Sequence, residues 1–91
     1  MQLRVVTYDI ANDKRRRHIA DLLEEEAVRV QESVFEVRLT DRAAAGLMRR
    51  LKMLTGDGDS LRLYTVPDNA LSRCDVVGGP AFVDGARYWL L

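Results

Sequence analysis

The sequence predicts an α+β fold, a ferredoxin-like βαββαβ sandwich in which two helices cover one face of an antiparallel sheet. Segments rich in β-branched and aromatic residues alternate along the chain with two segments whose apolar residues recur at helical spacing. The length of 91 residues corresponds to one small domain. Because so short a chain buries a marginal core by itself, we expect it to form a homodimer.

The first strand and the first helix come from the opening third of the chain. Residues 3–8 are β-branched and aromatic, and we predict a strand at the centre of the sheet, buried on both faces. Residues 9–13 form a turn that ends at Asp13, the predicted helix N-cap. A helix over residues 14–26 follows, because apolar residues recur at helical spacing at Ile19, Ala20, Leu22, Leu23 and Ala27.

Residues 28–39 return to strand composition, with a change of phase in the apolar pattern. Val28 and Val30 share one parity, whereas Phe35, Val37 and Leu39 share the other. This change predicts a bulge or a tight turn near residues 32–33. One bent strand and a short hairpin both fit the pattern.

The second half of the chain contributes a second helix, a further strand and a C-terminal segment. Thr40 or Asp41 caps the helix, which the glycine-rich residues 56–59 end. Its apolar face consists of Ala44, Leu47, Met48, Leu51 and Leu54. Residues 61–66 form the next strand, so residues 1–66 make up the ferredoxin-like core.

Residues 67–91 are predicted to be a C-terminal strand segment for dimer or partner contacts. A short strand is expected around residues 75–77, and the apolar residues 88–91 must be buried. They either form an edge strand on their own sheet or add to the sheet of the partner subunit, and we favour the second arrangement.

Composition and charge exclude several classes of protein. Hydrophobic residues at 47% and charged residues at 31% exclude a disordered chain. No apolar run approaches the roughly 18 residues of a membrane span, so we expect no membrane association. Equal numbers of basic and acidic residues, 14 of each, exclude a general polycation for nucleic acid but not a local basic patch. The one cysteine, Cys74, predicts a reducing, cytoplasmic location and a structural role.

The first predicted helix carries its charges at the wrong ends for the helix dipole. Its last turn holds three glutamates at residues 24–26, and its first turn holds Lys14, Arg15, Arg16 and Arg17. In one interpretation, backbone N–H groups and the four cations converge on a phosphate. In the other, this is a solvated basic turn offset by Asp13 and by an Arg17–Asp21 pair.

Asp9 follows the first strand directly, where side chains leave the core. A carboxylate there is suited to Mg²⁺, which takes one or two protein carboxylates and keeps several waters. A plain turn residue is the competing interpretation. Dimerisation about a two-fold axis near the first strand favours the metal site, because each subunit then supplies one carboxylate.

Two segments carry a family resemblance. They are Val6-Thr7-Tyr8-Asp9-Ile10, with Asp13 and the basic turn behind it, and the segment Arg29-Val30-Gln31-Glu32-Ser33-Val34-Phe35-Glu36. From about residue 3 to residue 66 the chain resembles the CRISPR-associated adaptation protein of the Cas-two family, whose members are named CRISPR-associated endoribonucleases.

The resemblance implies a function in CRISPR antiviral defence. It implies a homodimer whose C-terminal strands cross to the partner sheet, with Mg²⁺ held between the subunits. Members resemble metal-dependent endonucleases that cut single-stranded RNA, and some cut double-stranded DNA. The family also bridges two dimers of the Cas-one integrase during spacer acquisition. A non-catalytic DNA-binding scaffold of that integration complex is the alternative.

The same resemblance implies roles for individual residues. Asp9 matches the catalytic residue and metal ligand, and Arg16 and Arg29 match positions that hold phosphate. Ser33 and Phe35 match positions that shape the dimer groove, although Phe35 suits a plain core position equally well. His18 stands where some members carry arginine, so the helix face has one weaker positive charge at this position. We expect His18 to be a surface or RNA-contacting residue. Further phosphate contacts are expected from the remaining cations of the basic turn, Lys14, Arg15 and Arg17.

Overall fold

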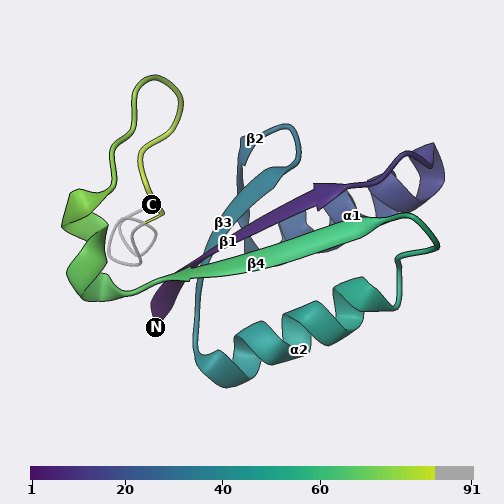
Figure 1. Ribbon diagram of the computed structural model, residues 1–91, viewed down its shortest axis with the longest axis horizontal. Coiled ribbons are helices and arrows are strands. Elements are labelled where there is room, and N and C mark those ends of the chain that lie inside the picture. Colours follow the sequence, from purple (N-terminus) through teal and green to yellow (C-terminus); the bar gives the residue numbers. More distant parts are fainter. Residues whose placement is uncertain (84–91) are drawn as a thin grey trace.

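The computed structural model describes residues 1–83 and confirms the predicted βαββαβ order (Figure 1). A 3-10 helix that the sequence analysis did not anticipate follows the last strand. The elements are β1 (Gln2–Asp9), α1 (Asp13–Glu26), β2 (Val28–Gln31), β3 (Val34–Leu39), α2 (Asp41–Lys52), β4 (Ser60–Val66) and the 3-10 helix η1 (Asp68–Arg73). The predicted strand at residues 88–91 lies outside the described residues.

The strands form one antiparallel sheet in the order β2-β3-β1-β4, with β1 in its centre as predicted (Figure 1). Successive side chains of a strand point to opposite faces of the sheet. Val6 and Tyr8 are buried on the helix-covered face, whereas Val5 and Thr7 on the other face are only half-buried. The prediction that β1 is buried on both faces therefore holds only in part: on the helix-free face Leu3 is 1% exposed, but the strand becomes more accessible toward Asp9, because within the described residues both helices pack on the other side.

Both helices contribute their predicted apolar faces to a single core. Buried residues of α1 and α2 pack against the central strands and enclose Phe35, which is fully buried. Burial of this apolar surface is the main force that holds the helices on the sheet. The helix residues of this core are Ile19, Ala20, Leu23, Leu47 and Leu51.

Residues 28–39 form a hairpin and not one bent strand. β2 and β3 pair antiparallel across a two-residue turn at Glu32 and Ser33. The pairing register shifts between Arg29 and Gln31, so this hairpin has both the turn and the irregularity that the parity change predicts.

The helix caps differ in one respect from the prediction. Asn12, not Asp13, caps α1: its extended backbone lets the side-chain oxygen accept the N–H of Arg15 at 2.9 Å. Asp13 is instead the first helical residue, where its charge still complements the helix dipole. Thr40 caps α2 and accepts the N–H of Ala43 at 3.2 Å.

The acidic end of α1 is balanced by cations from later in the chain. Glu24 forms an ion pair with Arg29 of β2, with 3.2 Å between Glu24 Oε1 and Arg29 Nη1. Arg50 of α2 reaches both Glu25, at 3.7 Å, and Glu26, at 3.3 Å. These pairs are exposed, so each contributes little. Together they partly offset the unfavourable position of the glutamates at the C-terminal end of the helix dipole.

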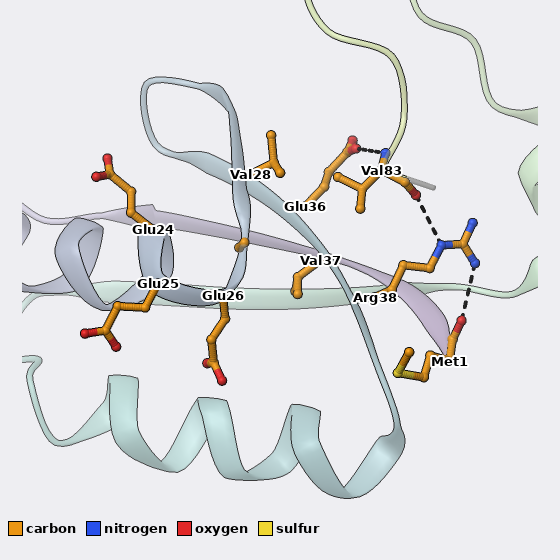
Figure 2. Close-up of a pocket in the computed structure, with 10 residues that line it drawn as sticks. Met1, Glu24, Glu25, Glu26, Val28, Glu36, Val37, Arg38 and Val83 are labelled. Carbon is orange, nitrogen blue, oxygen red and sulfur yellow. Dashed lines mark hydrogen bonds between the residues drawn. The ribbon is translucent and has the colours of Figure 1, made fainter. Parts of the chain in front are cut away.

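The segment after β4 returns to the sheet without forming the strand predicted at residues 75–77, which have no regular structure. Gly78 and Gly79 both take positive φ angles of 74°, which turn the chain back. The buried Val83 donates its N–H to Glu36 Oε1 at 3.0 Å and accepts from Arg38 Nε at 3.1 Å (Figure 2). At Val83 the segment is thus held on β3 by side-chain hydrogen bonds and not by a strand ladder.

Val83 also lines a pocket of about 350 Å³ between the end of α1 and the β2–β3 hairpin (Figure 2). Glu36 lies opposite Val5 on the helix-free face and is only 8% exposed, because this segment passes over it. Up to Val83, the tail thus covers one part of the helix-free face and does not pass over the arrowhead end of β1 (Figure 1). None of the helices described between residues 1 and 83 has the length and apolar character to cross a membrane.

Arg4 provides a test of how the sheet holds α2. Its side chain is buried on the helix side and donates to Leu39 O at 3.0 Å, to Thr65 Oγ1 at 2.9 Å and to Asp41 Oδ1 at 2.7 Å. We expect Arg4→Met to lower the free energy of unfolding by about 2 kcal/mol, since it leaves a carbonyl and a hydroxyl without their charged donor. Urea denaturation measures the loss, with the exposed Lys14→Met as the control. Equal stability of the two variants would contradict the prediction.

Candidate metal and nucleic-acid site

Asp9 is the exposed last residue of β1 and lies opposite Ser60, the first residue of β4. By strand alternation its position belongs to the same face as Val5 and Thr7, which is the face without helices. The residue predicted to bind metal is therefore accessible from solvent at one end of the open sheet face.

The surroundings of Asp9 suit a cation that keeps most of its water. Residues 1–83 contain no group of three or more His, Cys, Asp or Glu side chains that would form a complete metal site. One exposed carboxylate is nevertheless the type and number of ligand that Mg²⁺ takes from a single chain. The donor chemistry therefore fits Mg²⁺ if a second copy of Asp9 supplies the other carboxylate.

The β2–β3 turn holds the strand end beside Asp9. Tyr8 donates its N–H to Ser33 O at 3.2 Å, and its hydroxyl donates to Glu32 O at 3.4 Å. Ser33 is thus brought to the Asp9 end of β1, where its backbone fixes the residue before Asp9.

A groove of about 380 Å³ runs beside this turn and brings three of the predicted phosphate contacts together. They are Arg16 and Arg17 of α1 and Arg29 of β2. Four carboxylates also line the groove, so its formal charge is mixed, with no excess of basic side chains. The remaining lining residues are Tyr8, Asp13, Ala20, Asp21, Glu24 and Glu32.

Arg29 and Phe35 act together at the groove. The Arg29 guanidinium carbon lies 5.1 Å from the centroid of the Phe35 ring, a cation–π arrangement that orients the cation. Phe35 itself is fully buried and stacks near Tyr8, with ring centroids 6.3 Å apart. Phe35 is therefore a core residue, and its link to the site is the support it gives to Arg29.

Arg16 is bound to the chain around it. Its Nη1 donates to Ile10 O at 3.0 Å and to Ala11 O at 3.2 Å, and its Nη2 pairs with Asp13. The ion pairs of residues 1–83 include this Arg16–Asp13 pair but not the expected Arg17–Asp21 pair. Arg16 thus closes the turn that follows Asp9 as well as lining the groove.

Arg15 points away from the groove and binds Asp59 of the α2–β4 turn. Its Nε donates to Asp59 Oδ2 at 2.8 Å and its Nη2 to Oδ1 at 3.3 Å. The prediction that four cations converge on one phosphate is wrong, because successive residues of a helix are rotated by about 100° around its axis. Lys14 and His18 are exposed on α1 and, like Arg15, do not line the groove.

The Arg15–Asp59 pair shifts the ionisation of both groups. The hydrogen bond from Arg15, followed by the N–H of Gly56, lowers the pKa of Asp59 below its ordinary value of 3.8. The same hydrogen bond raises the pKa of the Arg15 guanidinium. Both groups are therefore charged at neutral pH.

Three residues of the α2–β4 turn and of β4 were missed by the sequence analysis: Asp59, Arg62 and Tyr64. Arg62 lies opposite Thr7 on the helix-free face and donates to the Tyr64 hydroxyl at 2.9 Å. Alternation of polar and apolar residues along residues 60–66 is the signal that would have placed both on this face. Asp59 had no such signal, because its partner is 44 residues away in the sequence.

Comparison with known proteins identifies the family. A family model described as CRISPR associated protein Cas2 matches residues 1–74.

The chain belongs to the Cas2 family.

Similar proteins agree with this family and with the fold. An endoribonuclease Cas2 of Synechocystis sp. is 43% identical over 81 residues, which are 88% of each chain. The crystal structure of a hypothetical protein, TT1823, from Thermus thermophilus has a TM-score of 0.77 and 41% identity, and the match covers 88% of this chain and 95% of that one. A chain from a partial Cas6-RT-Cas1–Cas2 complex has a TM-score of 0.73 and 25% identity, with coverage of 85% and 91%.

The Asp59 carboxylate predicts a specific acid sensitivity of this Cas2 family member. Since the pKa of Asp59 is lowered by folding, its ion pair stabilises the fold above pH 3.8 and is lost as pH falls through the lowered value. We expect Asp59→Asn to be less stable than the wild type above about pH 5, with the difference shrinking in more acid solution. Guanidinium denaturation between pH 2 and 7 measures it, and a difference that does not vary with pH contradicts the assignment.

Proposed function

We propose that the chain is a Mg²⁺-dependent endonuclease that cuts single-stranded RNA and acts in CRISPR adaptation as a homodimer. The observation that carries the proposal is the position of Asp9, exposed at the end of β1 on the helix-free face. A groove with three arginines lies beside the same strand end. Relatives named CRISPR-associated endoribonucleases support the reaction class.

The helix-free face supports the homodimer. Thr7 and Val5 are half-buried there, and Tyr64 is 50% exposed. If two such faces meet about a two-fold axis, apolar and aromatic side chains are buried and the two Asp9 residues come from opposite subunits. A single acidic position then contributes two carboxylates to one site.

The residues of this chain divide the work at the site. Asp9 from each subunit would hold the Mg²⁺, which when bound neutralises charge on the oxygens of the phosphodiester. Arg17 and Arg29 bind the substrate phosphates, and the Phe35 ring keeps the Arg29 guanidinium in place. The only histidine, His18, does not line the groove, so we assign it no role in proton transfer.

A DNA-binding scaffold of the spacer integration complex is the second candidate function. The similarity to a chain from a complex that contains Cas1 and Cas2 favours it, with a Cas1 integrase as the partner and double-stranded DNA as the ligand. In that function Lys14 and Arg17, both exposed on α1, follow the phosphates of the duplex. One protein can perform both functions, because Asp9 serves only the nuclease and Lys14 only the scaffold, while Arg17 binds phosphate in both.

The nuclease proposal depends on the Asp9 carboxylate. We expect Asp9→Asn to reduce Mg²⁺-dependent cleavage of a fluorescent single-stranded RNA by at least about 100-fold, since the amide lacks the charge that binds the cation. Asp75→Asn removes an exposed carboxylate from the tail and serves as the matched control. Cleavage that persists in Asp9→Asn and in EDTA would refute the proposed chemistry.

The scaffold proposal depends on the exposed cations. We expect the double variant Lys14→Ala, Arg17→Ala to reduce the slope of log affinity against log salt for double-stranded DNA by about 1.8, since each lost phosphate contact contributes about 0.9. Fluorescence anisotropy between 50 and 300 mM KCl, on the order of the physiological range, measures the slope. In cells, spacer acquisition should fail in this variant and persist in Asp9→Asn. The reverse result would leave the nuclease as the sole function.

A further inference from the structure

Three segments meet at the Asp9 end of the sheet, one of them far from the other two in the sequence. They are the end of β1, the first turn of α1 and the turn between α2 and β4, which Figure 1 shows at the same end of the molecule. Asp59 closes the last of these turns and immediately precedes Ser60, the partner of Asp9 in the β1–β4 ladder. A contact to Asp59 therefore acts one residue away from the backbone that holds Asp9.

Arg15 makes that contact through two hydrogen bonds, one to each carboxylate oxygen of Asp59. The Asp59 side chain is only 3% exposed and also accepts the N–H of Gly56 at 2.8 Å. Arg15 is fixed at its other end, because its backbone N–H donates to the Asn12 side chain. The pair therefore joins two anchored backbones through a buried carboxylate and a planar guanidinium.

Gly56 provides the space that this guanidinium needs. A Cβ atom at this position would lie 2.9 Å from Arg15 Cζ and 3.0 Å from Nε. Any side chain there would push the guanidinium away from Asp59. The turn thus accommodates Arg15 because Gly56 has no Cβ atom, and a substitution at Gly56 can displace Arg15 without changing the charge of the site.

The connection between Asp9 and α1 is held from both sides. Arg16 donates to Ile10 O and Ala11 O within the connection, and the Arg15–Asp59 pair closes the path from β4 back to the helix. Without the pair, the β4 side of this strand end would depend on the last ladder contact alone, and contacts at strand ends open more readily than those in the middle of a sheet.

We propose that Arg15 is a positioning residue that acts through Asp59 to fix Asp9 for metal binding, and that it does not contact nucleic acid. The proposal rests on the assignment of Asp9 as the metal ligand. It replaces the expectation from sequence that Arg15 binds phosphate. It follows that a substitution of Gly56 or Asp59 should lower the affinity of Asp9 for a metal cation, although neither residue is a ligand.

Metal binding by the full-length protein tests the proposal without any nuclease assay. Mn²⁺ is the probe, and electron paramagnetic resonance of free Mn²⁺ gives the affinity. We expect Arg15→Lys, Asp59→Asn and Gly56→Ala each to weaken Mn²⁺ binding about tenfold. This is the lower end of the loss in metal affinity seen when a residue that orients a metal ligand is changed. Gly46→Ala is the control, since its Cβ would meet only Arg49 Nη2 at an ordinary 3.7 Å.

A double-mutant cycle shows whether Arg15 and Asp59 act as one unit. The combined variant Arg15→Gln, Asp59→Asn should weaken Mn²⁺ binding by the same factor as either single change. Losses that multiply would mean that the two residues act independently and would overturn the proposal.

RNA binding in EDTA separates positioning from phosphate contact. Arg15→Gln should keep the wild-type salt slope for a single-stranded RNA, whereas Arg17→Gln should reduce it by about 0.7. A reduced slope in Arg15→Gln would show that Arg15 contacts phosphate and would overturn the inference.

The outcomes distinguish this inference from the proposed function. If Asp9→Asn leaves Mn²⁺ affinity unchanged, the metal assignment of Asp9 fails and this inference fails with it. If Asp9→Asn abolishes Mn²⁺ binding while Arg15→Lys, Asp59→Asn and Gly56→Ala bind Mn²⁺ like the wild type, only the positioning role fails. Should Gly56→Ala not fold, as judged by circular dichroism, Arg15→Lys and Asp59→Asn still decide the question.

Discussion

The central position of β1 is the constraint on which the rest of the structure depends. With hydrogen-bonded neighbours on both edges, this strand presents Val6 and Tyr8 to the helices and Val5 and Thr7 to the opposite face. The two-residue alternation of a strand makes the two faces inseparable. The packing that buries Val6 therefore also determines that the Asp9 position belongs to the helix-free face.

The basic turn of α1 shows how a helix distributes a charge cluster. Four consecutive cations cover a full turn, so their side chains leave in different directions. Arg15 is directed to Asp59, Arg16 closes the chain after Asp9, and Arg17 lines the groove. Two of these cations thus build the site's framework, and a charge run in the sequence overstates the number available to a ligand.

The helix-free face and the tail together determine where a second molecule can approach. Glu36 and Arg38 of β3 bind Val83 through both its N–H and its carbonyl oxygen, so the tail occupies one part of the face (Figure 2). Among residues 1–83 nothing covers the Asp9 end, and Arg62 and Tyr64 extend that surface along β4. The Asp9 position and the groove arginines therefore lie on different sides of the same strand end, the first on the open sheet face and the second on the α1 side.

The sequence by itself determined the order of elements, the central strand, both apolar helix faces and the position of Asp9 at a strand end. These follow from local periodicity and capping chemistry, which act over a few residues. Only the tertiary structure decided the pairing of Arg15 with Asp59, the support of Arg29 by Phe35 and the course of the tail over Glu36. Such contacts join residues distant in sequence, so their geometry depends on how sheet and helices pack and leaves no periodic signal in the chain.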